Sequence, residues 1–239
     1  MMNVVLLHGF GENASIWDEF VGLLPEDNHY ICPDFSFVTN CQTIDDYADW
    51  LKQELDNQQI SDCVIVGHSM GGYIALAFAE KYPATLNGIC LLHSTAYADT
   101  EERKATRLKT AEFIEKHGTA EFIKDFLPNM FNDEFKATHR EYILGKIEAY
   151  KLIPKEALIA ATLAMRERPD RRTLLKTLKI PIQFIAGELD KFIPIEASKE
   201  QIEMLNYSKN AILEGIAHAG MLEKPELTAD ILGDFLRDL

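Results

Sequence analysis

The sequence predicts an α/β fold, in which a doubly wound, mainly parallel sheet of six strands carries a helical insertion. Short apolar runs of strand length alternate along the chain with segments of helical periodicity, which indicates strands joined by crossover helices. These runs are continuously apolar, which is typical of parallel strands covered on both faces. With 239 residues, 47% of them hydrophobic, the chain is long enough to bury one sizeable core.

The six expected strands are residues 3–7, 29–32, 63–66, 88–92, 180–186 and 210–213. Residues that favour helix ends lie between them. We expect Asn13 or Ser15 to open the first helix and Thr43 to open the second, because their side chains can accept hydrogen bonds from the first helical N–H groups. Tyr82-Pro83 should close the helix that follows the third strand, since proline does not continue a helix.

The strand pattern vanishes over residues 98–168, which instead show helical periodicity. This periodicity is interrupted at three residues, Gly118, Pro128 and Pro154. We therefore expect a helical cap over 98–168, inserted between two core segments, 1–97 and 169–239. Most of its apolar side chains should pack within the insertion or against the sheet, and a minority should line an apolar substrate pocket.

The most informative motif is Gly67-His68-Ser69-Met70-Gly71, which follows a buried-looking strand and precedes a helix-forming segment. This is the Gly-x-Ser-x-Gly pattern of a nucleophile elbow, a sharp strand-to-helix turn that lifts the serine hydroxyl out of the sheet. Glycines two residues before and after the serine leave room for strand and helix to cross closely. The motif predicts that Ser69 is a catalytic nucleophile.

Two further residues complete a catalytic set with Ser69. A base is needed to take the proton of the serine, and His218 lies in a Gly-flanked loop after the last expected strand. Asp190 follows the fifth strand and would orient His218 and stabilise its charged form. Glu188 and Asp99 compete with Asp190 for this role; we expect Glu188 to be a solvated loop charge and keep Asp99 as the second alternative.

The order serine, acid, histidine, together with His8-Gly9 after the first strand, closely resembles the α/β-hydrolase superfamily. The resemblance runs from His8-Gly9 to the helix after His218. It implies a sheet of α/β-hydrolase type with a helical cap after the fourth strand. Members commonly carry two strands before the one that ends in His-Gly, and here only two residues precede it, so that pair should be lacking.

The resemblance also implies an oxyanion hole made by the main-chain N–H groups of Phe10 and Met70. His8 would brace the loop that carries Phe10, and Asp34 would hydrogen-bond a loop after the second strand. His68 would shape the elbow without transferring protons.

Composition excludes several function classes. A net charge of −14, without a compensating run of Lys or Arg, argues against binding nucleic acid or an anionic membrane surface. No motif for a metal or a nucleotide is present, so we expect no cofactor and no metal. Four cysteines without metal-ligand spacing are expected to be free thiols. The first strand begins at once, leaving no room for a signal peptide, so we expect a cytoplasmic protein, a monomer or homodimer.

These observations predict a serine hydrolase that cleaves small carboxylic esters, a carboxylesterase or lactonase, through an acyl-enzyme. Its expected partner is a small-molecule ester substrate. One alternative is carbon–carbon bond hydrolysis or elimination, as in a menaquinone-pathway synthase of the same superfamily, and another is a non-catalytic ligand receptor on this fold. Anionic substrates of the first alternative need a basic pocket. The expected cap contains five arginines, Arg103, Arg107, Arg140, Arg166 and Arg168, which we interpret as exposed, solubilising charge.

Overall fold

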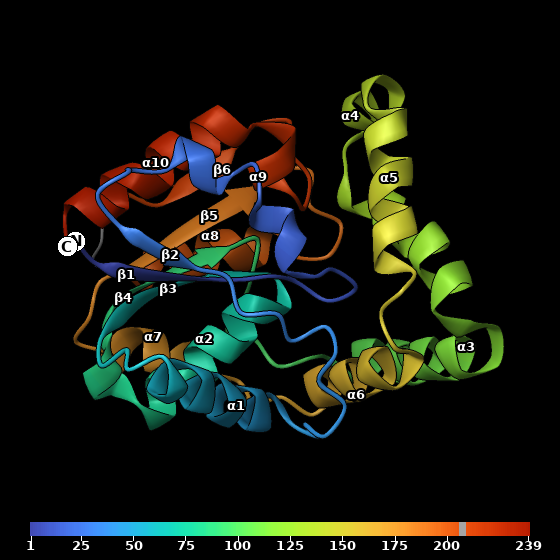
Figure 1. Cartoon of the computed structure of the whole chain (residues 1–239), viewed down its shortest axis with the longest axis horizontal. Coiled ribbons are helices and arrows are strands. Elements are labelled where there is room, and N and C mark those ends of the chain that lie inside the picture. The colour runs from blue at the N-terminus through green and yellow to red at the C-terminus, as the bar shows by residue number, and fades with distance from the viewer. Residues whose placement is uncertain (206–208) are drawn as a thin grey trace.

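The structure is a computed structural model that describes residues 1–205 and 209–239, with a parallel sheet at its centre (Figure 1). In the described residues the sheet has six strands in the order β2-β1-β3-β4-β5-β6, and each neighbouring pair is parallel. The strands are β1 (Asn3–Leu7), β2 (His29–Ile31), β3 (Cys63–His68), β4 (Leu86–Leu92), β5 (Ile182–Gly187) and β6 (Ala211–Leu213). The six predicted strands are thus confirmed, with ends shifted by up to two residues.

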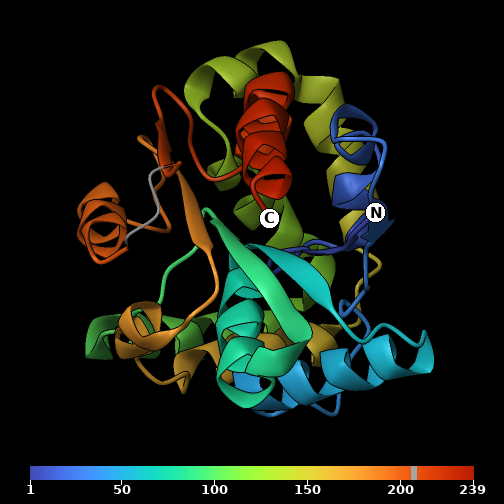
Figure 2. The same cartoon turned by 90° about the vertical axis from the view of Figure 1, so that its left-hand side faces the viewer.

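Helices cover both faces of the sheet, as the continuous apolar strands require (Figures 1 and 2). Helices α1 (Ile44–Asn57) and α2 (Met70–Lys81) pack side by side on one face. Helix α10 (Pro225–Arg237) lies on the other, where the Phe235 ring lies over Gly88 of β4. The remaining core helices are α7 (Arg172–Thr177), α8 (Ile195–Glu203) and α9 (Gly220–Glu223).

Two predicted helix ends are confirmed and one helix is not. The Thr43 hydroxyl accepts from Asp46 N–H while the Asp46 carboxylate accepts from Thr43 N–H, a capping box that begins α1. Helix α2 ends before Tyr82-Pro83. The Asn13 side chain does cap a helical turn, but only two 3₁₀ turns come after it, η1 (Ala14–Trp17) and η2 (Val21–Leu23), because Gly22 and then Pro25 disfavour a longer helix.

A helical segment over residues 101–166, between β4 and α7, lies beyond the carboxyl ends of the strands (Figure 1). Its helices are α3 (Glu101–Phe126), η4 (Leu127–Met130), α4 (Asp133–Thr138), α5 (Arg140–Tyr150) and α6 (Lys155–Arg166). The three predicted interruptions are confirmed: Gly118 kinks α3 with φ 80°, Pro128 lies in the first turn of η4, and Pro154 precedes α6. Helices α3 and α6 pack against each other. They lie next to the carboxyl ends of the strands, the edge of the sheet that the candidate catalytic residues follow.

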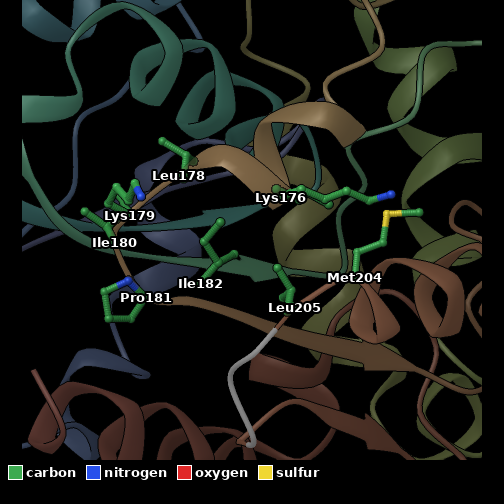
Figure 3. A pocket seen from close by; sticks show the side chains of 9 residues that line it. Lys176, Leu178, Lys179, Ile180, Pro181, Ile182, Met204 and Leu205 are labelled. Atoms are coloured by element: carbon green, nitrogen blue, oxygen red, sulfur yellow. The ribbon is translucent and has the colours of Figure 1, made fainter.

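A hollow of about 480 Å³ lies at the opposite end of the sheet (Figure 3). It is formed by the segment that leads into β5, including Leu178 and Ile182, and by Leu205 after α8. It lies by the amino ends of the strands, so it is remote from the expected catalytic residues. Within the described part of the chain, no helix has the length and apolarity needed to cross a bilayer.

Candidate active site

The elbow at Ser69 is a strained turn between β3 and α2. Ser69 has φ 50° and ψ −113°, in a region that non-glycine residues rarely adopt. A Cβ atom at Gly67 would lie 2.4 Å from the main chain of Gly71 and Gly72, and one at Gly71 would lie 2.5 Å from Leu7 O. The steric reason predicted for both motif glycines is therefore confirmed. Ser69 stays partly exposed although both its neighbours are buried.

The elbow is held from the end of β4. The Ser94 hydroxyl donates to the carbonyl oxygen of Ser69 over 2.7 Å. Met70 begins α2, so its N–H is one of the first helical donors, which have no partner within the helix. That N–H is therefore available to a ligand at Ser69.

His218 and Asp190 meet as the sequence predicts. Asp190 Oδ2 lies 2.6 Å from His218 Nδ1, and both side chains are almost fully buried. A carboxylate accepts, so Nδ1 donates and Nε2 of the neutral ring is left to accept a proton. The other oxygen, Asp190 Oδ1, accepts from the N–H groups of Phe192 and Ile193. Burial acts to raise the pKa of Asp190, but attraction and hydrogen bonding by His218 hold it below its ordinary value.

The two competing carboxylates lie elsewhere. Glu188 is exposed and accepts from Gly215 N–H over 2.9 Å, as expected for a loop charge. Asp99 is buried against arginines, with Arg107 Nε at 2.9 Å and Arg168 at 2.8 Å. Asp190 is therefore the one of the three that contacts His218.

The main chain around His218 is fixed by hydrogen bonds from two directions. Glu223 Oε1 accepts from Ala217 N–H at 3.1 Å and Ala219 N–H at 3.3 Å. His218 N–H itself donates to Met130 O of η4 over 2.9 Å. Burial raises the pKa of Glu223, although the donated hydrogen bonds act in the other direction. The main chain that carries the imidazole is thus held by Glu223 of α9 and by Met130 of η4.

A buried pair that was not predicted from the sequence lies beneath the elbow. Glu12 Oε2 accepts from Gly9 N–H at 2.6 Å and lies 3.0 Å from His68 Nδ1. His68 Nε2 donates to His218 O at 2.8 Å. Because His68 directly precedes Ser69, this bond brings the main chain of His218 close to the elbow. Burial opposes both charges, but their mutual attraction lowers the pKa of Glu12 and raises that of His68. A carboxylate within an otherwise apolar, glycine-rich loop was the available signal.

His93, at the end of β4, is a second residue that was not predicted from the sequence. Its Nε2 accepts from Gly220 N–H at 2.9 Å, so the proton of the neutral ring is on Nδ1, which faces Asp190 Oδ2 at 3.7 Å. Burial lowers the pKa of His93 to about 4. The ring is therefore a neutral neighbour of the Asp190 carboxylate. A histidine directly after an apolar strand was the signal for it.

The two predicted oxyanion donors are brought together. Phe10 and Met70 line the same narrow cavity, between the loop after β1 and helix α6. The predicted bracing by His8 is also present: Nδ1 lies 2.9 Å from Gly9 O, while Nε2 lies 3.2 Å from Phe35 N and 3.3 Å from Asp34 Oδ1. Burial opposes ionisation of Asp34, but hydrogen bonds from His8 and Ser36 lower its pKa to about 2.

A cavity of about 160 Å³ adjoins this site. Four aromatic rings line it, those of Phe10, Phe122, Phe126 and Phe192. The Phe192 ring lies 4.8 Å from the His218 ring, between centroids, which places the cavity beside the candidate base. Part of the wall comes from the first turns of α3, which contribute Arg103 and Arg107.

The expectation that the five arginines are exposed, solubilising charge is wrong for Arg168, which is buried, and only partly right for Arg103, Arg107 and Arg166, which are half-buried. Arg168 is only 6% exposed, because its guanidinium donates to Met165 O and pairs with the buried carboxylate of Asp99. The Arg107 side chain is 15% exposed and binds the same carboxylate. Arg140 is exposed, as expected. The buried carboxylate of Asp99 thus holds Arg107 and Arg168 away from solvent.

Comparison with known proteins relates nearly the whole chain to one family. The model of the Alpha/beta hydrolase family matches residues 4–231. Human monoacylglycerol lipase ABHD6 is 24% identical over 261 residues, which cover 98% of this chain and 75% of the lipase. The pimeloyl-[acyl-carrier protein] methyl ester esterase of Wigglesworthia glossinidia brevipalpis is 24% identical over 258 residues, covering 99% of this chain and 94% of that enzyme.

Solved structures give the same result. A thermophilic esterase from Thermogutta terrifontis, with malate bound, superposes with a TM-score of 0.93 at 27% identity, covering 100% of this chain and 90% of that one. The enol-lactonase of Burkholderia xenovorans LB400 shares the fold, with a TM-score of 0.84 at 18% identity over 99% of this chain and 91% of that one. On the family match and this fold, the chain belongs to the alpha/beta hydrolase family and is a hydrolase.

Proposed function

We propose that the protein is a serine hydrolase that cleaves small carboxylic esters, as a carboxylesterase or lactonase, through Ser69, His218 and Asp190. The observation that carries this proposal is the 2.6 Å hydrogen bond between Asp190 Oδ2 and His218 Nδ1, which leaves His218 Nε2 as a base. The 2.8 Å contact between His68 Nε2 and His218 O supports it, because it brings the histidine loop to the elbow. Relatives named as ester hydrolases support the bond type.

In this reaction Ser69 Oγ attacks the ester carbonyl carbon while its proton passes to His218 Nε2. The N–H groups of Phe10 and Met70 stabilise the negative oxygen of the tetrahedral intermediate. The carbon–oxygen bond to the alcohol then breaks, and His218 returns the proton to the leaving alkoxide. Water attacks the acyl-enzyme with His218 again taking a proton, which passes to Ser69 Oγ as the acid leaves. The net reaction converts an ester and water into an acid and an alcohol.

We assign two further roles in the same proposal. Asp190 keeps the proton of His218 on Nδ1 and stabilises the imidazolium that forms during attack. Residues 98–168 form a cap whose α3 and α6 faces close the site above the oxyanion loop. The small, aromatic cavity of about 160 Å³ favours short acyl chains.

The test is hydrolysis of p-nitrophenyl esters from acetate to decanoate by the wild type and by Ser69→Ala. We expect saturable turnover with a burst of nitrophenol, a short-chain optimum, and loss of turnover in Ser69→Ala. Ser61→Ala is the matched control, because Ser61 is an exposed serine before β3. A fluorophosphonate should label Ser69, as read by mass spectrometry of the peptides. Turnover by Ser69→Ala would contradict the proposal. So would a folded wild-type protein that turns over none of the esters.

A further inference from the structure

The cavity beside His218 is lined by four phenylalanine rings and, from α3, by two arginines and two threonines. Among the described residues that line it, only Arg103 and Arg107 carry charge. Both lie on one face of α3 with Thr106 and Thr110, because residues three and four apart on a helix point the same way. The polar wall therefore consists of two guanidinium groups and two threonine hydroxyls, and the hydroxyls already donate to Glu102 O and Thr106 O of the same helix.

Three arginines share a single carboxylate behind this wall. Asp99 Oδ2 lies 2.9 Å from Arg107 Nε, while Asp99 Oδ1 lies 2.8 Å from Arg168 and 3.6 Å from Arg103. One negative charge against three positive charges leaves an excess of two positive charges. Arg168 is spent on the fold, since it also donates to Tyr97 O and Met165 O. The excess is thus presented by Arg103 and Arg107.

This excess lies in a poorly solvated place. The Arg107 side chain is 15% exposed and that of Arg103 is 34% exposed. Burial lowers the pKa of Arg107, and repulsion by Arg168 adds to this effect. A positive charge away from water interacts more strongly with an anion than an exposed one does. The protein carries a net charge of −14, so this local positive wall runs against its overall charge.

From this arrangement we propose that the preferred substrates are esters whose acyl chain carries a second, free carboxylate. The ester lies at Ser69, the methylene chain lies among the phenylalanine rings, and the carboxylate binds Arg103 and Arg107. A guanidinium fits a carboxylate with two parallel hydrogen bonds, which favours this anion over a neutral chain end. This inference rests on the proposed function, since it names the substrate class of the same site.

The experiment compares monomethyl adipate with its uncharged isostere, methyl 6-methylheptanoate, by methanol release. We expect the wild type to favour the anionic ester in kcat/KM by about 10-fold or more, the scale of a charge-assisted hydrogen bond. Arg103→Gln and Arg107→Gln should each lower that ratio, and the double variant should bring it to one or below, because the aromatic walls then favour the neutral chain. Arg140→Gln removes the same charge from an exposed site of the helical segment and should leave the ratio unchanged.

Arg103→Gln keeps the assay informative if Arg107→Gln folds poorly, because Asp99 then retains both of its closer arginines. A wild type that prefers the neutral ester, or a ratio unaltered in Arg103→Gln and the double variant, overturns the inference. Failure of the proposed function is distinguished by turnover of neither ester. In that case calorimetry of monomethyl adipate with Ser69→Ala decides: binding that is lost in the added Arg103→Gln supports the carboxylate site, and no binding to Ser69→Ala overturns it.

Discussion

His68 donates from Nε2 to the main-chain oxygen of His218 over 2.8 Å, although His68 ends strand β3 and His218 lies in a loop 150 residues later. The other ring nitrogen lies 3.0 Å from Glu12 Oε2, which also accepts from Gly9 N–H. One chain of hydrogen bonds therefore joins the loop before Phe10, the elbow and the loop of the candidate base. Since both nitrogens of His68 are engaged, we expect it to position these segments and not to transfer protons.

Glu12→Gln tests this positioning. Glutamine keeps the size and can accept from Gly9 N–H, but it removes one half of a buried ion pair. We expect the free energy of unfolding at pH 6 to fall by about 1 to 3 kcal/mol. We also expect kcat to fall about 10-fold with KM little changed, because the displaced loop carries a donor that acts on the transition state. Urea unfolding and ester kinetics measure both effects. An unchanged kcat with lowered stability would leave only a structural role for the pair.

The pH dependence of stability has a predicted sign for this pair. The pKa of Glu12 is lowered from 4.5, so its contribution is present above pH 4.5 and lost as the pH falls through the lowered value. The pKa of His68 is raised from 6.5, so its contribution is complete below pH 6.5 and lost as the pH rises through the raised value. The difference in Tm between wild type and Glu12→Gln should therefore be largest between pH 4.5 and 6.5. A difference that is constant from pH 3 to 9 contradicts the ion pair.

Asp190→Asn removes the acceptor of His218 Nδ1. The amide can present its N–H₂ to that nitrogen and so favour the wrong tautomer, and we expect kcat to fall by about 10³- to 10⁴-fold. The matched control is Glu188→Asn, two residues earlier in the same loop, which should keep activity within about 3-fold because Glu188 is exposed. Steady-state kinetics on one p-nitrophenyl ester suffice. Equal losses of kcat in both variants would mean that activity depends on the conformation of the loop and not on the carboxylate at position 190.

His93→Asn tests the neutral ring beside Asp190. Asparagine tolerates the positive φ of 48° at this position, but Gly220 N–H loses its acceptor, so we expect a loss of about 1 to 2 kcal/mol at pH 7. A histidine whose pKa is lowered from 6.5 to about 4 destabilises the fold as the pH falls between these values. The variant lacks this effect, so its deficit should shrink toward pH 4. His117→Asn, at an exposed site, should not alter the profile. Urea unfolding at several pH values provides the comparison, and a deficit that widens in acid contradicts the neutral ring.

Gly187→Ala tests how closely β5 approaches the histidine loop. An added Cβ would lie 1.9 Å from Ala217 O and 2.6 Å from Ile216 O, so the residues before His218 must shift. We expect kcat to fall about 100-fold, since small displacements of a catalytic group have effects of that order. Gly145→Ala, within α5 and with open space around it, should keep activity and gain stability of about 0.5 to 1 kcal/mol. Activity near wild type in folded Gly187→Ala would show that the loop absorbs the methyl group.

The sequence predicted features that depend on local order. The strands were found because each is a short apolar run, and the elbow because its glycines are required within five consecutive residues. Asp190 and His218 were found although they lie 28 residues apart, since each follows a strand and parallel strands end at the same edge of the sheet.

The features that were missed depend on contacts between distant loops. Glu12 and His68 are 56 residues apart, and neither residue signals the other. The same holds for Asp99 and Arg168: the buried carboxylate explains the buried arginine, but only the fold brings them together. The expected helix after Asn13 became 3₁₀ turns because a cap fixes only the first turn, while helix length depends on the residues of the later turns.

The bond from His218 N–H to Met130 O, and that from Asn132 N–H to Glu223 Oε2, fasten the middle of the helical segment to the loop that carries the candidate base. A rigid swing of the whole segment would break both hydrogen bonds and remove the support that they give to the His218 loop. We therefore expect substrate entry to leave both hydrogen bonds intact. Any movement that admits substrate should then take place around a fixed point beside the candidate base, so that the imidazole keeps its position while the site opens.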